Sequence, residues 1–218
     1  MYPFLKRASD VILSFLAILI MVPWWIVIFV IIKIQSPGPV IYKARRVGMN
    51  GKIFTLYKFR TMCVNSGKVH ATTLRSDSRV YSFGKILRMS KLDETPQFFN
   101  ILRGEMSIIG PRPEDEINAR DIYSGEYARI LSVKPGLSSP ASLYDFTHGE
   151  KYDTEEAYNK EFLPQKLFLE LFYVDNRTFF YDVKIVFQTA LTILLMFFGK
   201  QNFKEPIELK NKKEGAVP

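Results

Sequence analysis

Two adjacent acids, Asp93 and Glu94, are the residues of this sequence best suited to carry out chemistry. Pro96 follows the pair closely and predicts that a helix begins beside the two acids. A helix N-terminus keeps a nearby carboxylate ionised and attracts phosphate, so one acid can attack phosphorus or bind a metal ion. Acids at helix starts also act as simple capping groups, and Ser90-x-x-Asp93 resembles a capping box. The pair alone therefore does not establish catalysis.

The same pair matches the way in which proteins hold Mg²⁺. That ion takes one or two carboxylates and completes its shell with water and the phosphate oxygens that a diphosphate substrate supplies. Neighbouring residues of a helix point about 100° apart, so the two acids need not do the same work. We expect Asp93 and Glu94 to be both the catalytic acids and the Mg²⁺ ligands, with one of them in line with phosphorus.

Basic residues that can bind phosphate lie elsewhere in the chain. Arg112 stands between two prolines that restrict its backbone, which suits a fixed guanidinium fork, although a surface turn explains the pattern equally well. Lys58 and Arg60 share one face of a predicted strand, and spacing alone favours a solvated face for both. Arg46 and Arg88 complete the set of basic candidates.

The composition narrows the class of partner. The 218 residues carry a formal net charge of +8, which points to nucleic acid, an anionic bilayer or a phosphorylated substrate. A nucleic-acid binder needs its basic residues in a continuous stripe with stacking aromatic residues, whereas here they are scattered, so we expect no nucleic acid. The single cysteine excludes an intrachain disulfide, and the two histidines lie too far apart in sequence to suggest a His-rich zinc site.

The stretch Val11–Ile32 contains no charged residue, and its 22 residues are long enough to span a bilayer. Pro23 lies at its midpoint and predicts a kink, because proline removes a backbone donor and clashes with the preceding turn. Basic residues flank both ends, which fits poorly with the one-sided charge bias of a simple spanning helix. A re-entrant hairpin with both ends on the cytoplasmic side and a single kinked spanning helix explain these features equally well.

The rest of the chain predicts an α+β protein of mostly helical character. Two short strands, 40–42 and 53–57, flank an Asn-Gly turn and predict a β-hairpin. Residues 137–152 are predicted to be irregular. The predicted helical regions are 83–89, about 91–103 with Gly104 as its end, 114–131, a helix capped by Thr154, 164–176 and 179–198.

These elements suggest three parts of the chain. Residues 1–36 would form the membrane-embedded helix, 37–203 a catalytic domain with interfacial amphipathic helices, and 204–218 a disordered tail. The apolar region 179–198 contains Asp182 and Lys184, which make it a poor spanning segment. We therefore expect it to lie in the membrane interface or against the core.

Several motifs, in this order, resemble the bacterial sugar transferase family, specifically its monotopic polyprenyl-phosphate phosphoglycosyl transferases. The resemblance covers roughly residues 3–198. The order in which the motifs occur is too specific to arise by chance. The motifs are the apolar N-terminal segment with its central proline, Ser36-Pro-Gly-Pro-Val-Ile-Tyr42, Arg46-Val-Gly48, Tyr57-Lys-Phe-Arg-Thr-Met62, Leu92-Asp-Glu-Thr-Pro-Gln-Phe-Phe-Asn100, Gly110-Pro-Arg-Pro113 and Lys134-Pro-Gly136.

The resemblance implies transfer of a phosphosugar from a UDP-sugar to undecaprenyl phosphate, with release of UMP, as the first membrane step of surface glycan assembly. It also implies a re-entrant helix bent at Pro23 and a monotopic location at the cytoplasmic face of the bacterial inner membrane. Asp93 would form a covalent phosphosugar intermediate, and Glu94 would assist through Mg²⁺ or by activating the polyprenyl phosphate. The implied substrate contacts are Arg46, Lys58, Arg60, Arg88, Arg112 and Glu170.

Two departures from the family pattern concern the substrate-binding side. Residues 137–150 lack the glutamine and arginine usual there, and Tyr144, Asp145 and His148 stand in that segment, where ordinary packing is the simpler interpretation of each. Glu170 occupies a position where the family often has aspartate, so a carboxylate is kept with a longer reach.

A different class of function remains open, that of a catalytically silent membrane scaffold for glycan-assembly enzymes. Such a scaffold would tolerate Asp93→Asn, whereas an enzyme that uses Asp93 would not. The large aromatic content is compatible with a homodimer. The identity of the sugar is not encoded in any recognisable residue.

Overall fold

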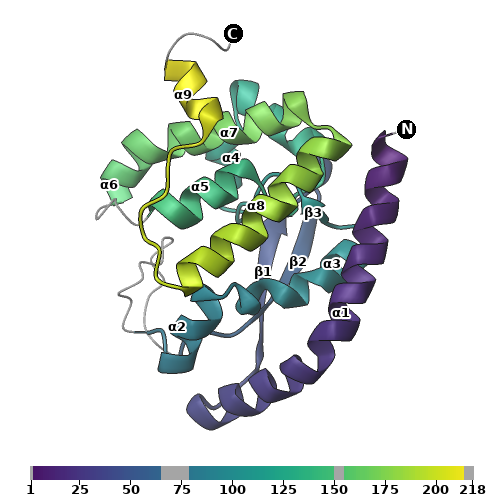
Figure 1. The fold of residues 1–218 in the computed structure, drawn as a ribbon, viewed down its shortest axis with the longest axis vertical. Coiled ribbons are helices and arrows are strands. Elements are labelled where there is room, and N and C mark those ends of the chain that lie inside the picture. Colours follow the sequence, from purple (N-terminus) through teal and green to yellow (C-terminus); the bar gives the residue numbers. More distant parts are fainter. Residues whose placement is uncertain (1, 65–78, 150–154, 214–218) are drawn as a thin grey trace.

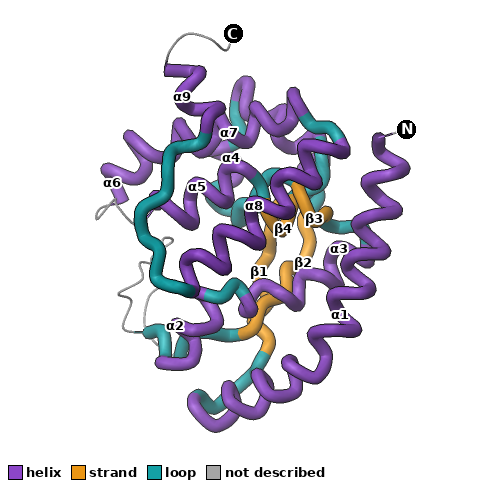
Figure 2. The backbone as a smooth tube through the Cα atoms, viewed as in Figure 1, coloured by secondary structure: helices purple, strands orange, loops and turns teal. Residues whose placement is uncertain are grey.

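The fold combines helices with two separate pairs of short strands. A computed structural model describes residues 2–64, 79–149 and 155–213. The two strand pairs lie near the middle of the molecule, with α1 along one side and α7 and α8 over another, as Figure 2 shows. The predicted mixture of helices and short strands is confirmed.

Helix α1 spans Tyr2–Gln35 and is one continuous helix of 34 residues that contains Pro23. Its second half curves away from the line of the first, as expected where proline removes a helical hydrogen bond (Figure 1). The chain therefore bends without leaving the helix, in agreement with the kink predicted at Pro23. Large apolar side chains are exposed along most of its length, from Ile12 to Val30.

Polar contacts fix the first half of α1 to the rest of the molecule. Lys6 Nζ lies 2.8 Å from Asp182 Oδ2 of α8, which spans Phe179–Phe197. Asp10 is buried, and its Oδ1 accepts a hydrogen bond from the Ile108 backbone nitrogen at 3.0 Å. Because burying unpaired charges is costly, these paired groups hold α1 in one position on the globular part.

The predicted β-hairpin is confirmed. Strands β1 (Ile41–Val47) and β2 (Ile53–Phe59) pair antiparallel, and both are longer than expected. The turn Met49–Gly51 between them contains Asn50 at a φ of 57°, a left-handed conformation that asparagine tolerates well. One face of the hairpin packs into the core through Phe54 and Leu56, which are buried with residues of the following segments.

The acids lie in a 3₁₀ turn rather than at the start of an α-helix. Helix α2 (Ser82–Met89) ends before the pair, and the turn η2 (Leu92–Gln97) leads into α3 (Phe98–Arg103), which Gly104 ends at a φ of 81°. The capping-box prediction is wrong, because Ser90 Oγ donates to the carbonyl oxygens of α2. Lys91 adopts a φ of 57° and turns the chain between the two elements.

A second strand pair positions the Gly-Pro-Arg-Pro turn. Strands β3 (Ser107–Ile109) and β4 (Gly136–Ser138) pair in parallel. A Cβ atom on Gly136 would lie 2.1 Å from the backbone nitrogen of Gly110, so only glycine permits this approach of the two chains. The motifs around residues 110 and 136, distant in sequence, are thereby brought together.

The remaining described elements are helical. Residues 114–131, predicted as one helical region, instead hold the short helix α4 (Ala119–Ile122) and the 3₁₀ segment η3 (Gly125–Ser132). Residues Pro140–His148 form α5 where an irregular segment was predicted, and Ser139 caps this helix by accepting from the Ser142 nitrogen at 2.9 Å. Thr154 lies outside the described residues. The other elements are α6 (Glu155–Ala157), the π-helical turn η5 (Tyr158–Phe162), α7 (Leu163–Asn176) and α9 (Ile207–Lys213).

Helix α9 corrects the prediction of a disordered tail from residue 204. Its Leu209 is only 2% exposed and packs with Tyr144, Phe162 and Leu169. Burial of a leucine side chain among aromatic rings offsets the entropy cost of ordering the segment.

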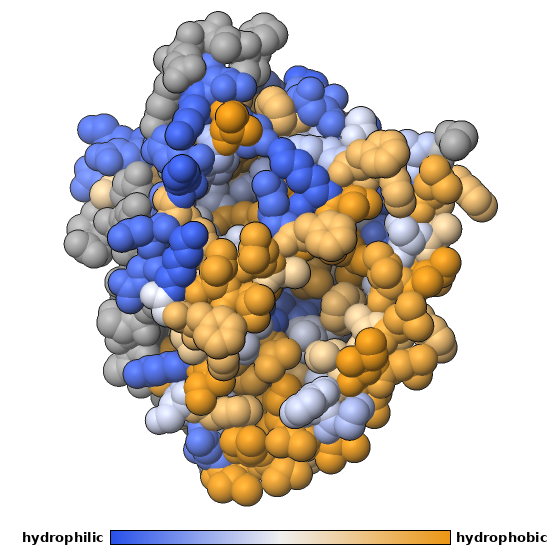
Figure 3. Space-filling model, viewed as in Figure 1, coloured by the Kyte–Doolittle hydropathy of each residue, from blue (hydrophilic) through white to orange (hydrophobic). Residues whose placement is uncertain are grey.

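Two helices of the described chain, α1 and α8, are long and apolar enough to cross a membrane by length and composition. Their exposed side chains form a broad apolar face that covers the lower and right parts of the view in Figure 3. On α8 this face includes Phe187, Leu191 and Phe197, whereas Asp182 is buried near the helix start. Lys184, two residues after Asp182 on α8, is exposed.

Candidate active site

Both acids of the pair are buried, Asp93 with 7% and Glu94 with 6% of its surface exposed. The turn η2 that carries them packs against β2, the strand that carries Lys58. A buried pair of carboxylates is unfavourable without compensating cations. The side chains around the pair therefore decide whether each acid is charged.

Glu94 is held by two cations at the same oxygen. Its Oε1 lies 2.9 Å from Lys58 Nζ and 2.9 Å from Arg112 Nη2. Burial acts to raise the pKa of Glu94, but Arg112 and Lys58 outweigh it and lower that pKa well below its usual value. Glu94 is therefore ionised at any physiological pH.

Asp93 has the opposite environment. Its Oδ1 is buried and has no hydrogen-bond partner among the described residues. Burial and the neighbouring charge of Glu94 raise the pKa of Asp93 to about 6, against the opposing influence of Lys58, Lys91 and Arg88. Two adjacent carboxylates with pKa values driven apart are suited to different roles, and the unpartnered oxygen belongs to Asp93.

Four cations surround this pair in the described part of the chain. Lys58, Arg88, Lys91 and Arg112 all act electrostatically on one or both acids, and Asp145 and Glu114 are further carboxylates that act on Arg112. Cations gathered in this way suit the phosphoryl oxygens of a diphosphate ester. The sequence predicted three of these cations, Lys58, Arg88 and Arg112, as phosphate contacts.

Lys91 is the cation that sequence reasoning missed. Its ammonium lies 4.3 Å from the centre of the Phe146 ring, in the divergent segment that forms α5. The left-handed backbone that directs this side chain cannot be read from a lysine in the sequence, because non-glycine residues rarely adopt it.

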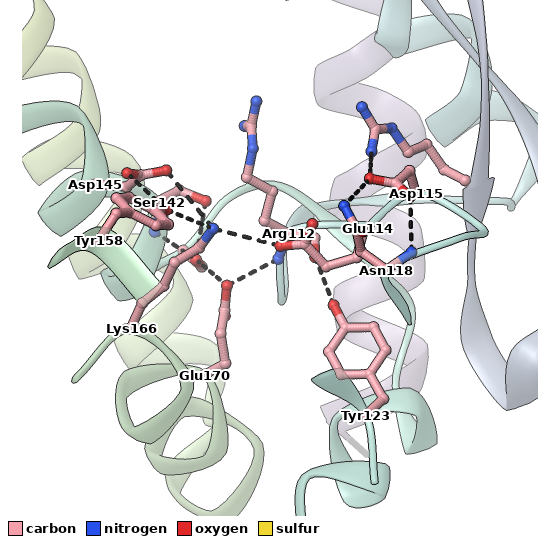
Figure 4. A network of polar contacts seen from close by, with 12 residues as sticks. Arg112, Glu114, Asp115, Asn118, Tyr123, Ser142, Asp145, Tyr158, Lys166 and Glu170 are labelled. Carbon is pink, nitrogen blue, oxygen red and sulfur yellow. Dashed lines mark hydrogen bonds and ion pairs between the residues drawn. The ribbon is translucent and has the colours of Figure 1, made fainter. Parts of the chain in front are cut away.

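Arg112 is held by its own main chain as well as by Glu94. Its nitrogen donates to Glu170 Oε1 at 3.0 Å, and its carbonyl oxygen accepts from the Tyr123 hydroxyl at 3.0 Å. Figure 4 shows Glu170 and Tyr123 on the main-chain side of Arg112, with the guanidinium pointing away from both. Glu170 was predicted to contact substrate, but the structure places it behind Arg112, with Ser139 Oγ 3.3 Å from its Oε1.

Two of the predicted substrate contacts are engaged elsewhere. The buried guanidinium of Arg60 donates to the carbonyl oxygens of Ser36 and Pro37, where it stabilises the turn after α1. Arg46 Nη1 lies 3.6 Å from Asp115 Oδ2. The solvated face that strand spacing favoured for Lys58 and Arg60 is wrong, because Arg60 is buried against these carbonyl groups and Lys58 pairs with Glu94.

The donor set fits a magnesium ion that the substrate helps to hold. The described residues contain no group of three or more His, Cys, Asp or Glu side chains that could enclose a metal. Asp93 and Glu94 supply two adjacent carboxylates, and Asp93 Oδ1 is a free acceptor. Mg²⁺ is commonly bound in this way, by one or two carboxylates together with water and phosphate oxygens.

An apolar cleft of about 670 Å³ lies between the second half of α1 and the β-hairpin. Pro96, which lines it, is in the same turn as the acid pair. Trp25 Nε1 donates to Thr95 Oγ1 at 2.9 Å and so ties α1 to that turn. The other lining residues are Val22, Trp25, Ile26, Phe29, Val40, Ile41, Tyr57, Phe59 and Phe99, with Lys43 and Arg103 as the charged ones.

The divergent segment contributes both packing and polar contacts. Tyr144 stacks between His148 and Phe162, with ring centres 4.7 and 4.8 Å away, which agrees with the simpler interpretation of these two polar side chains. Asp145 differs, because its Oδ2 lies 3.7 Å from the buried Lys166 Nζ (Figure 4).

Comparisons with known proteins agree with the motifs. The chain is 39% identical over 202 residues to the UDP-N-acetylgalactosamine-undecaprenyl-phosphate N-acetylgalactosaminephosphotransferase of Aeromonas hydrophila, covering 90% of this chain and 45% of that protein. It is 38% identical over 190 residues to the UDP-glucose:undecaprenyl-phosphate glucose-1-phosphate transferase of Escherichia coli K12, covering 85% of this chain and 39% of the relative. The chain thus spans less than half the length of these two relatives.

A shorter relative matches over nearly its whole length. The exopolysaccharide production protein PSS of Rhizobium leguminosarum bv. phaseoli is 33% identical over 203 residues, which cover 87% of this chain and 95% of that protein. The sequence model of the family described as bacterial sugar transferase matches residues 1–196. The chain therefore belongs to the bacterial sugar transferase family.

Proposed function

We propose that this protein transfers a phosphosugar from a UDP-sugar to a polyprenyl phosphate at a membrane surface. The observation that carries the proposal is the unequal acid pair, in which Glu94 is neutralised by Lys58 and Arg112 while Asp93 keeps an unpartnered buried oxygen. The names of the relatives, which include UDP-sugars and undecaprenyl phosphate, support the same substrate classes.

In the first step, a carboxylate oxygen of Asp93 attacks the phosphorus that bears the sugar. The bond between this phosphorus and the bridging oxygen of the diphosphate breaks, and UMP leaves with the bonding electron pair. An aspartyl phosphosugar remains on the enzyme. Arg112, Lys58, Arg88 and Lys91 supply the positive charge that stabilises the phosphoryl oxygens and the departing UMP.

In the second step, a phosphate oxygen of the polyprenyl phosphate attacks the same phosphorus. The bond to Asp93 breaks, the carboxylate is restored, and the product is a polyprenyl diphosphate sugar. A pKa of about 6 leaves Asp93 mostly ionised near neutral pH, as required of a nucleophile, and makes it a moderately good leaving group. Glu94, ionised throughout, keeps Lys58 and Arg112 in place beside Asp93.

Mg²⁺ would be held by Asp93 and Glu94 and would supply further positive charge to the diphosphate. We infer its presence from the fit of the two carboxylates alone.

The polyprenyl chain would lie in the apolar cleft beneath α1. The lining is almost entirely apolar, and Pro96 brings it to the turn of the acid pair. Lys43 and Arg103 offer cations to an anionic head group. A polyprenyl chain can enter this cleft from the bilayer only if α1 lies in the bilayer. We therefore propose that α1 enters the membrane, turns back at its bend near Pro23 and returns to the cytoplasmic face.

The proposal is tested by isotope exchange. Labelled UMP is incubated with the protein, Mg²⁺ and a UDP-sugar, without polyprenyl phosphate, using UDP-glucose, UDP-galactose and UDP-N-acetylgalactosamine in turn. Label should enter the UDP-sugar with wild type and not with Asp93→Asn, because only a covalent intermediate can return the phosphosugar to UMP. Exchange that requires polyprenyl phosphate would indicate direct transfer. No exchange and no UMP release in wild type, together with full biological function of Asp93→Asn, would support the scaffold instead.

A further inference from the structure

The main chain of Arg112 is held from two distant parts of the sequence. Pro111 and Pro113 have no N–H group, so the Arg112 N–H is the one amide donor in this three-residue stretch, and Glu170 of α7 accepts it at 3.0 Å. Tyr123, which follows α4, donates its hydroxyl to the Arg112 carbonyl oxygen at 3.0 Å. Both polar groups of one residue are thus fixed by side chains (Figure 4).

Burial of the Glu170 carboxylate costs free energy. It is 3% exposed, its Oε2 has no hydrogen-bond partner among the described residues, and Ser139 is its other neighbour at 3.3 Å. Lys166 and Glu114 are the charged groups that also act on it electrostatically. An apolar residue of similar volume would leave the Arg112 N–H without this acceptor, so the carboxylate serves the Arg112 main chain.

The position of the Arg112 side chain beside the acid pair indicates what Glu170 does. Its guanidinium makes one of the two cation contacts to Glu94, at 2.9 Å, and so contributes to the difference between the two acids. An arginine on an unrestrained turn would sample many rotamers, and fixing one of them costs entropy at each binding event. Two main-chain hydrogen bonds remove backbone movement of the turn in advance.

We propose that Tyr123 and Glu170 are positioning residues, which hold the Arg112 main chain so that its guanidinium meets the diphosphate in a preformed place. This inference rests on the proposed function for the identity of the diphosphate. Neither residue touches the substrate, and both act through Arg112.

The test uses inorganic pyrophosphate as a probe of the anion site, because its binding requires no turnover. Dissociation constants are measured for wild type, Tyr123→Phe, Glu170→Leu, Glu170→Gln and Arg112→Ala, and for both double variants that combine Arg112→Ala with Tyr123→Phe or Glu170→Leu. Tyr173→Phe is the control, since its hydroxyl makes buried hydrogen bonds to Ile109 and Asp182 and none to Arg112.

Tyr123→Phe and Glu170→Leu should each weaken pyrophosphate binding about three- to tenfold, the equivalent of one lost hydrogen bond. Glu170→Gln keeps an acceptor for the Arg112 N–H and should restore most of the affinity. In the Arg112→Ala background, Tyr123→Phe and Glu170→Leu should change affinity less than about twofold. UDP-sugar turnover, measured in parallel, should show a raised KM with a smaller change in kcat.

Three results with the positioning and control variants would overturn the inference. They are wild-type affinity in Tyr123→Phe and Glu170→Leu, full additivity with Arg112→Ala, and an equal loss in Tyr173→Phe. Equal pyrophosphate binding by wild type and Arg112→Ala would overturn it as well, because Arg112 would then not bind the anion. Pyrophosphate binding that follows the expected pattern, without turnover of any UDP-sugar, would uphold the positioning role and contradict the proposed function.

Discussion

At the residue scale, two neighbouring acids differ because their surroundings differ. Lys58 and Arg112 neutralise Glu94, whereas Asp93 is buried with one oxygen that has no hydrogen-bond partner. The sequence was sufficient to single out the pair and three of the cations around it. It could not show which acid each cation binds, because this depends on how a strand, a turn and a proline-flanked loop meet in space.

The buried charge of Asp93 predicts a gain in stability on neutralisation. Its pKa rises from an ordinary 3.8 to about 6, so the ionised form destabilises the fold by about 2–3 kcal/mol at roughly 1.4 kcal/mol per tenfold change in proton affinity. This penalty is complete above the folded-state value and absent below the ordinary one. Asp93→Asn should therefore be more stable than wild type at pH 7.5, and the difference should vanish towards pH 4.

Urea unfolding of both proteins at pH 7.5, 6, 5 and 4 checks this expectation. A difference that stays constant with pH would mean that the amide stabilises by packing rather than by removing a charge.

Lys58 lowers the pKa of both acids, so its removal should move the pH dependence of the reaction. Without this cation the pKa of Asp93 rises above about 6, and the acidic limb of kcat/KM should shift to higher pH in Lys58→Met. Arg46→Met removes a cation that pairs with Asp115 instead and is the matched control. An acidic limb at the same pH in Lys58→Met and wild type would show that Lys58 does not influence the ionisation of Asp93.

At the scale of elements, local signals predicted the hairpin, α2, α3, α7 and α8, because turn residues and apolar spacing are local properties. Two helices were missed for different reasons. The Ser139 cap and Pro140 that start α5 were present in the sequence but were outweighed by the serine and proline content of the segment. Helix α9 has a charged, proline-bearing sequence, and its order depends on Leu209 entering a distant part of the core.

The contribution of α9 can be measured with one matched pair of substitutions. Leu209→Ala should lower the free energy of unfolding by about 2–4 kcal/mol, as for a fully buried leucine. Ile207→Ala, on the same helix but 61% exposed, should change it by less than about 0.5 kcal/mol. Equal effects would show that α9 does not pack against the core in solution.

At the scale of the whole molecule, one bent helix joins the apolar surface to the acid pair. Its first half is fixed to α8 by Lys6 and Asp182, and its second half forms a wall of the cleft that ends at Pro96. The membrane lipid substrate and the phosphosugar donor would thus approach Asp93 from different sides. The sequence predicted the bend at Pro23 but not the cleft, which exists only where α1 and the hairpin face each other.

The proposed re-entrant arrangement of α1 predicts a specific topology in membranes. Single cysteines placed at Phe4 and at Tyr42, both exposed, in a Cys63→Ser background should react with an impermeant reagent from the cytoplasmic side only. Reaction of the two positions from opposite sides would contradict the re-entrant arrangement and support a spanning α1.

The central claim, that Asp93 carries the phosphosugar, is tested most directly by intact mass spectrometry. Wild type and Asp93→Asn are incubated with Mg²⁺ and each UDP-sugar, without polyprenyl phosphate, and the adduct is located by peptide mapping. We expect wild type alone to gain the mass of one phosphosugar, on the peptide that contains Asp93. An adduct of equal yield on Asp93→Asn, or UMP release that depends on polyprenyl phosphate and leaves no adduct, would contradict the claim.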